Sequence, residues 1–139
     1  MSQSSNNNAA LQAPDANLYE YAVVRYVPRV EREEFVNIGL VMMCKRSRWI
    51  KVAFNIDSPR IKAFHTECDH DCLTAQTASF INIADGRSDG GPIAALEPHE
   101  RFRWLTAVRS ASIQTSRPHP GKTDNLDSKF NELFSKLVL

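Results

Sequence analysis

Hydrogen-bonding side chains recur at every second position between Arg109 and Arg117. Side chains alternate between the two faces of a strand, so this spacing predicts a strand with one polar face. A row of four side chains would make up this predicted face: Ser110, Ser112, Gln114 and Ser116. A Pro-His-Pro-Gly sequence follows and predicts a turn that holds His119 at the rim of the row. Hydroxyl and amide donors beside guanidinium groups suit a phosphate, a carboxylate or the backbone of a partner.

Three interpretations of this row remain open. The polar face can simply face water or keep an edge strand from aggregating. It can bind an anionic group or a partner. It can also carry a serine nucleophile with His119 as its base, although the segment lacks the Gly-x-Ser-x-Gly elbow of such enzymes. Burial of the polar groups would separate the first two interpretations.

A second group of candidate residues lies nearer the N-terminus. Arg25 stands among apolar residues and needs a partner, either Glu34 or a ligand anion. Asn37 and Gly39 interrupt an apolar run. Gly39 indicates a bulge or a close backbone approach, and Asn37 can bond a buried backbone group or a ligand, with the structural role favoured.

The tract from His65 to Cys72 contains two histidines and two cysteines, at His65, Cys68, His70 and Cys72. Its spacing differs from that of the usual zinc sites, in which a Cys pair is well separated from a His pair. We therefore expect no metal site. No glycine-rich nucleotide-binding motif is present, and no cofactor is expected.

Composition narrows the class of protein. The 139 residues are 42% hydrophobic and 24% charged, which fits one folded domain. The formal net charge of +1 does not favour nucleic acid, although Lys45, Arg46, Arg48 and Lys51 cluster on a predicted hairpin. No apolar run reaches the ~20 residues that span a bilayer, so no membrane partner is expected. Three cysteines and the absence of a secretory leader favour the cytoplasm.

The elements that must position these residues follow from periodicity. Residues 1–17 are predicted to be a disordered tail, and residues 18–139 a single domain. Strands are predicted at 19–27, 36–44, 49–54 and 109–116, with the second and third forming a hairpin. Helices are predicted near 57–64, at 69–80, from Pro98 and at 126–138, with a loop at 84–92. The fold class is α+β, with a small antiparallel or mixed β-sheet packed against three or four helices.

Five segments in this order resemble a known bacterial family. They are 21–28, 32–39, 100–105, 109–116 and 119–121, followed by a Leu-Phe helix. The chain resembles the family catalogued as domain of unknown function 3037. The resemblance implies a small bacterial cytoplasmic protein and suggests a HipA-like kinase as a partner. It implies no activity.

Two functional hypotheses follow. The first is a non-catalytic binding or accessory module whose polar patch holds an anionic group or a protein partner. Its candidate residues are Arg25, Glu34, Asn37, Arg109, Ser110, Gln114, Ser116 and His119. The alternative is a hydrolase or phosphate-handling enzyme that uses His119 and Glu34 as acid and base.

Overall fold

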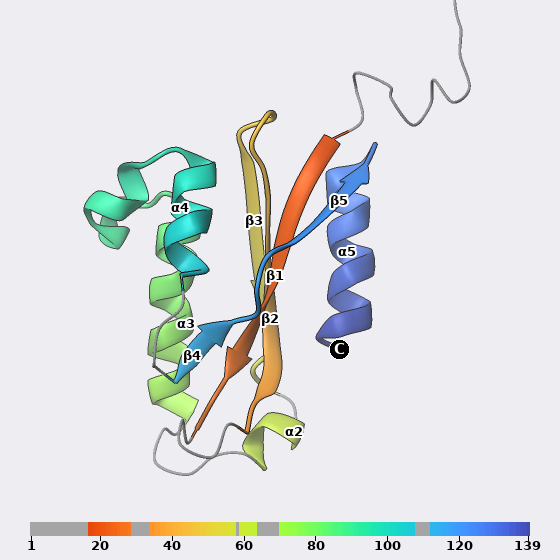
Figure 1. The fold of residues 1–139 in the computed structure, drawn as a ribbon. Helices are drawn as coiled ribbons and strands as arrows, with labels where there is room; N and C mark the ends of the chain where they lie inside the picture. Colours follow the sequence, from red (N-terminus) through yellow and green to blue (C-terminus); the bar gives the residue numbers. More distant parts are fainter. Residues whose placement is uncertain (1–16, 29–33, 58, 64–69, 108–111) are drawn as a thin grey trace, which may run out of the picture.

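Five antiparallel strands form one sheet in the part of the chain that the structure, a computed structural model, describes: residues 17–28, 34–57, 59–63, 70–107 and 112–139. The order is β3–β2–β1–β4, and β5 pairs with the other half of β1 (Figure 1). The strands are β1 (Asn17–Tyr26), β2 (Val36–Cys44), β3 (Trp49–Phe54), β4 (Ile113–Thr115) and β5 (His119–Thr123).

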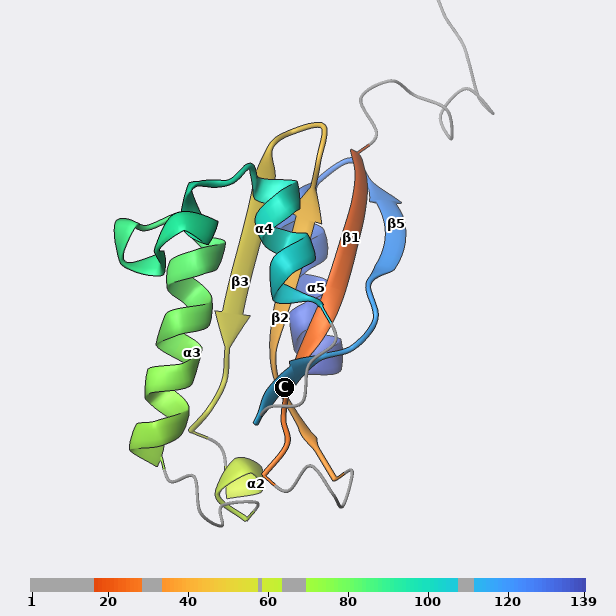
Figure 2. The same cartoon turned by 60° about the vertical axis from the view of Figure 1, so that its left-hand side comes forward.

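Helices cover both faces of this sheet. One face packs against α3 (His70–Ala84) and α4 (Pro98–Leu105), and the other packs against α5 (Leu126–Leu137), as Figures 1 and 2 show. The short helix α2 (Pro59–Lys62) and two 3-10 helices, η2 (Ser88–Gly90) and η3 (Pro92–Ala95), complete the described elements. The α+β class and the sheet packed on helices are confirmed.

The central strands β1 and β2 are buried from both sides. Val24, Tyr26 and Val41 face the core beneath α3 and α4. Leu40 and Met42 face the second core, beneath α5. A strand covered on both faces has no polar side, which explains the nearly continuous apolar run from Val36 to Cys44.

Gly39 marks an irregularity in the pairing of these strands. Val24 pairs with Gly39, but the next residue of β1, Arg25, pairs with Asn37, so β2 contains one extra residue. A Cβ on Gly39 would lie 2.5 Å from the ring of Phe54. Both predictions for this glycine, a bulge and a close approach, are confirmed.

Four local predictions need correction or fall at least partly outside the described residues. The strand predicted at 109–116 is shorter in the described structure, where β4 covers Ile113–Thr115. Arg109 and Ser110 lie outside the described residues. The predicted Pro-His-Pro-Gly turn is wrong, because His119 begins strand β5. That strand pairs only with β1, and an edge strand tolerates the missing N–H of Pro120. Helix α3 runs to Ala84, beyond its predicted end. Residues 1–16 of the predicted tail also lie outside the described residues, whereas Asn17, predicted as its last residue, is the first residue of β1.

Candidate functional site

Three of the predicted site residues lie in one row across the sheet. Arg25 pairs with Gln114 of β4 on one side and with Asn37 of β2 on the other. Directly opposed residues share a face of the sheet. Because Val24 and Tyr26 face the core beneath α3 and α4, this row lies on the opposite face, the one that carries α5. We call Gln114, Arg25 and Asn37 the polar row.

Arg25 is the charged member of the polar row. Its guanidinium carbon lies 4.3 Å from the centre of the Phe35 ring, and Phe35 as a residue is 46% exposed. Its Nε is buried and makes no hydrogen bond. Within the residues that the structure describes, no carboxylate forms an ion pair with Arg25. A guanidinium held against an aromatic face keeps in-plane N–H groups suited to a bidentate anion.

Asn37 joins the polar row to the end of α5. Its amide nitrogen donates to the carbonyl oxygen of Leu137 at 3.0 Å. The last carbonyl groups of a helix have no partner within that helix, and a side-chain amide can satisfy one of them. This contact gives Asn37 the structural role that the sequence favoured, and it fixes α5 beside Arg25.

Ser116 also has a structural role. It is 7% exposed, and its hydroxyl accepts from the backbone N–H of Val23 at 2.9 Å and donates to the carbonyl of Arg117 at 3.0 Å. These bonds replace part of the ladder at the point where β4 has ended and β5 has not begun. A ligand would have to displace them, so we assign Ser116 to the fold.

His119 lies away from the polar row. It pairs with Tyr21, and the two rings are 5.2 Å apart. Tyr21 and Arg25 are four positions apart in β1, which corresponds to about 13 Å. Glu34 precedes β2, whose first residue, Val36, pairs with Tyr26, about 17 Å along β1 from Tyr21. The fold therefore does not bring together the acid and base of the enzyme alternative.

The described part of the His65–Cys72 stretch contains no metal centre. His70 Nε2 lies 2.7 Å from Asp57 Oδ1, and Cys72 is exposed on the first turn of α3. Among the described residues, no three His, Cys, Asp or Glu side chains are placed to hold an ion. His65 and Cys68 lie outside those residues.

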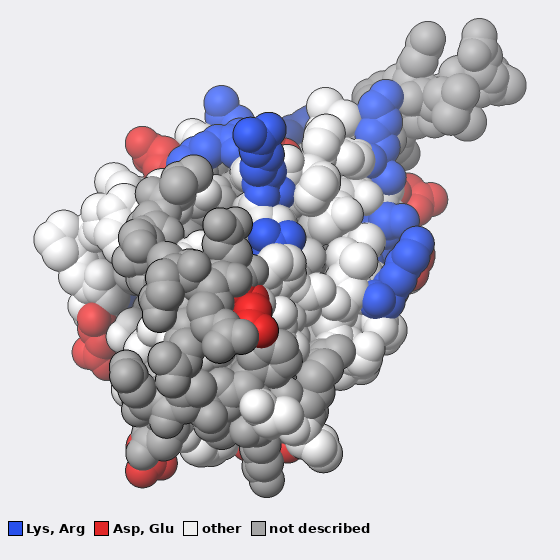
Figure 3. Space-filling view, turned by 60° about the horizontal axis from the view of Figure 1, so that its bottom comes forward, with Lys and Arg blue, Asp and Glu red and all other residues white. Residues whose placement is uncertain are grey.

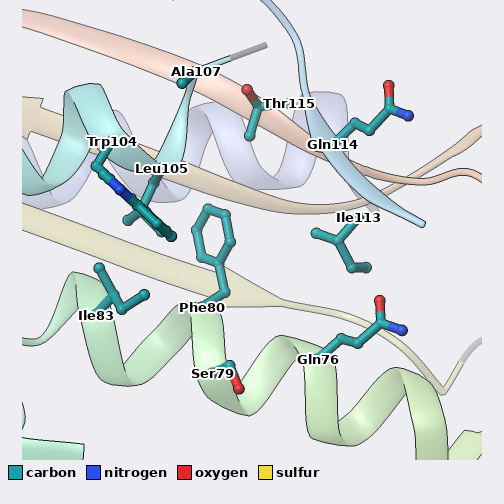
Figure 4. Close-up of a pocket in the computed structure, with 10 residues that line it drawn as sticks. All are labelled: Gln76, Ser79, Phe80, Ile83, Trp104, Leu105, Ala107, Ile113, Gln114 and Thr115. Atoms are coloured by element: carbon teal, nitrogen blue, oxygen red, sulfur yellow. The ribbon is translucent and has the colours of Figure 1, made fainter. Parts of the chain in front are cut away.

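A pocket that the sequence analysis did not predict lies on the other face of β4. It has a volume of about 330 Å³ and is enclosed by α3, the end of α4 and β4 (Figure 4). Phe80, Trp104, Leu105 and Ile113 supply most of its apolar wall, and the side chain of Gln114 points away from it. Trp104 remains 39% exposed there. The signal in the sequence was an aromatic residue on a short helix, which periodicity alone assigns to a core.

Charge on the end of the molecule where β1 finishes is uneven. Figure 3 views this end, and the described basic side chains lie in its upper half and along its right-hand side, with uncharged residues between several of them. Nucleic acid binding is favoured by a continuous basic surface, and the described residues in this view do not form one. No described helix is both long and apolar enough to cross a membrane.

Fold and site together define an α+β protein with one antiparallel sheet between two helical layers and a polar row at the end of one layer. A family profile described as a protein of unknown function (DUF3037) matches residues 21–138. The chain belongs to this family, as the resemblance of its segments indicated. No curated protein and no solved structure matches the chain.

Proposed function

We propose that this chain is a non-catalytic binding module that holds an anionic group of a protein partner at Arg25. One observation carries the proposal: Arg25 lies in the polar row, stacked on Phe35, without a carboxylate partner among the described residues. An arginine in a sheet between two paired strands is costly unless an anion or strong acceptor neutralises it. A carboxylate or phosphate of a partner would supply that charge.

The geometry also supports binding over catalysis. A catalytic site needs a nucleophile or a base within hydrogen-bond reach of the reacting group. The Ser116 hydroxyl is bonded to the backbone. His119 pairs with Tyr21, which lies about 13 Å along β1 from Arg25. A binding module needs none of these groups to meet.

The partner is part of the proposal. The family resemblance suggests a HipA-like kinase in the bacterial cytoplasm, and this kinase is the first partner to test. Affinity purification of the full chain from its native cell, followed by mass spectrometry, would show which proteins depend on Arg25. The comparison is between the wild-type chain and Arg25→Gln, which keeps a polar side chain and removes the charge.

The anion site itself can be tested without the partner. Thermal unfolding is followed in sodium acetate and in sodium phosphate, at constant ionic strength. At ten times Kd, a ligand that binds only the folded state stabilises it by about 1.4 kcal/mol, which corresponds to several degrees in Tm. We expect this response in the wild-type chain and its loss in Arg25→Gln.

The matched control is Arg87→Gln. Arg87 is exposed and pairs with Asp85 at 3.3 Å, just after the end of α3, which packs on the sheet face opposite to the polar row. Phosphate also stabilises proteins by exclusion from their surface, but that effect is shared by all three proteins. An equal response of Arg25→Gln and the wild-type chain to both anions would reject the site.

A further inference from the structure

We propose that the partner segment binds as an added β-strand along the outer edge of β4, with an apolar side chain in the pocket and an acidic side chain at Arg25. This inference rests on the proposed function and names the kind of segment that the site recognises. It combines three observations: the edge of β4, the pocket on one face and the polar row on the other.

Among the residues that the structure describes, the backbone of β4 pairs along one of its two edges, the edge that faces β1. Ser116 N donates to Val23 O at 2.8 Å, and Val27 N donates to Ser112 O at 2.7 Å. Between these bonds, the backbone groups of Gln114 also face β1, because alternate residues of an antiparallel strand point to the same neighbour. The N–H and C=O groups of Ile113 and Thr115 therefore point away from β1.

With respect to the described part of the chain, these outward groups form a short unpaired edge. The structure records no hydrogen bond for them to any residue that it describes. Unpaired groups in a row are a template for another strand, and several peptide-binding domains use an edge in this way. Backbone bonds then supply affinity, and side chains that alternate between the two faces supply specificity.

On the pocket face, the added strand would meet an apolar cavity. Ile113 projects into this cavity, whose far walls are Phe80 and Trp104 (Figure 4). A cavity of about 150 Å³ already holds benzene, so about 330 Å³ accepts one leucine or aromatic side chain of a partner. Such a side chain would also cover the exposed part of Trp104.

On the opposite face, the next side chain of the added strand would point toward the polar row. It would lie one strand beyond Gln114 and two strands from Arg25, about 10 Å between backbones, a span that two long side chains can bridge. The positive charge of Arg25 selects an acidic residue at this position. The recognised segment therefore alternates apolar and acidic residues.

The experiment uses the full chain and a labelled synthetic peptide, acetyl-Ser-Leu-Glu-Leu-Glu-Leu-Ser-amide. Binding is measured by fluorescence anisotropy, and amide exchange by NMR. We expect the amides of Ile113 and Thr115 to become protected when the peptide binds, while that of Gln114, already bonded to β1, changes little. This pattern is specific to pairing along the outer edge.

Matched variants test each contact. Thr115→Pro removes an outward N–H without removing a bond to β1, and Thr115→Val keeps the N–H. We expect peptide affinity to fall at least tenfold in Thr115→Pro and in Trp104→Ala, but not in Thr115→Val or Trp104→Phe. Arg25→Gln should lower the affinity for the glutamate peptide at least tenfold. It should leave the affinity for the analogue with glutamine in place of glutamate unchanged. Circular dichroism confirms that each variant folds.

The outcomes separate this inference from the proposed function. Suppose that anions still stabilise the chain through Arg25, but that the peptide does not bind, or binds Thr115→Pro and Trp104→Ala as tightly as the wild-type chain. Strand addition is then wrong, and the anion site stands. If Arg25→Gln changes neither the anion response nor peptide binding, both proposals fail. If the wild-type chain is a dimer in solution and Thr115→Pro is a monomer, the edge is occupied by a second copy, which overturns the inference.

Discussion

At the scale of the residue, two polar side chains within one predicted row have different surroundings. The hydroxyl of Ser116 makes hydrogen bonds to the backbone, whereas Gln114, two positions earlier, pairs across the sheet with Arg25. The alternation of side chains along a strand predicts that both lie on the same face. Both residues contact β1: Gln114 pairs with Arg25, and Ser116 N donates to Val23 O. What separates them is burial: a serine at the gap between β4 and β5 must replace a missing ladder bond.

The ion pair between Glu20 and Arg103 gives a prediction at this scale. Arg103 donates to both carboxylate oxygens of Glu20, at 2.7 and 2.5 Å. These hydrogen bonds hold the pKa of Glu20 below its ordinary value of 4.5. A lowered pKa in the folded state means that the pair stabilises the fold above pH 4.5, and that this contribution is lost as the pH falls below 4.5.

We expect Glu20→Gln to lower the free energy of unfolding at pH 7 by about 0.5 to 1 kcal/mol, since Arg103 is largely exposed. The difference from the wild-type chain should shrink toward pH 3. Urea unfolding at the two pH values measures it. Asp85→Asn, which breaks a longer and more exposed pair with Arg87, is the control and should have a smaller effect. A difference that persists unchanged at pH 3 would contradict the role of the ion pair.

At the scale of the element, Gly39 links the bulge in β2 to the packing of β3. The ring of Phe54 occupies the space in which a side chain at position 39 would lie. We expect Gly39→Ala to cost about 1 to 3 kcal/mol, because the ring must move within a packed sheet. Chemical denaturation measures the cost.

The control for this prediction is Phe54→Leu, a smaller side chain at the crowded position. If the cost arises from the ring, Gly39→Ala should be less destabilising in the Phe54→Leu background than in the wild-type chain, so the two changes are not additive. Equal costs in the two backgrounds would show that the loss does not come from the Phe54 ring but from the backbone, either the bulge conformation or the Ala53 carbonyl oxygen 2.8 Å from the added Cβ.

At the scale of the whole molecule, the two helical layers share β1 and β2. Neither strand can keep its place if one layer is lost, because each strand is buried from both sides. A single domain with a shared sheet is expected to unfold as one unit. The two tryptophans report on the two layers: Trp49 packs against the core beneath α5, and Trp104 lines the pocket beside α4.

We therefore expect the single-tryptophan variants Trp49→Phe and Trp104→Phe to unfold in one transition each, at which tryptophan fluorescence and far-UV circular dichroism coincide. Urea titration with both probes makes the comparison. Separate midpoints for the fluorescence of Trp104 and the circular dichroism of the same protein would show that the α3–α4 layer opens on its own.

The parts of this fold that could be predicted from the sequence are those whose signal is local. The run from Val36 to Cys44 has the composition of a doubly covered strand, and the Leu and Phe residues of α5 recur at helical spacing. Gly39 indicates a bulge for the same reason, since the cost of glycine in a strand depends on its own backbone. Arg25 and Gln114 also stand out by their immediate neighbours in the sequence, Arg25 among apolar residues and Gln114 among serines.

Only the tertiary structure decided which of these residues meet. Residues 25, 37 and 114 share a row because of the register between β1 and its two neighbours, and one residue of slippage would turn a strand's side chains to the other face. His119 lies in a strand and not in a turn because it pairs with Tyr21 of β1. Register and pairing depend on contacts between residues distant in sequence, and no local pattern contains them.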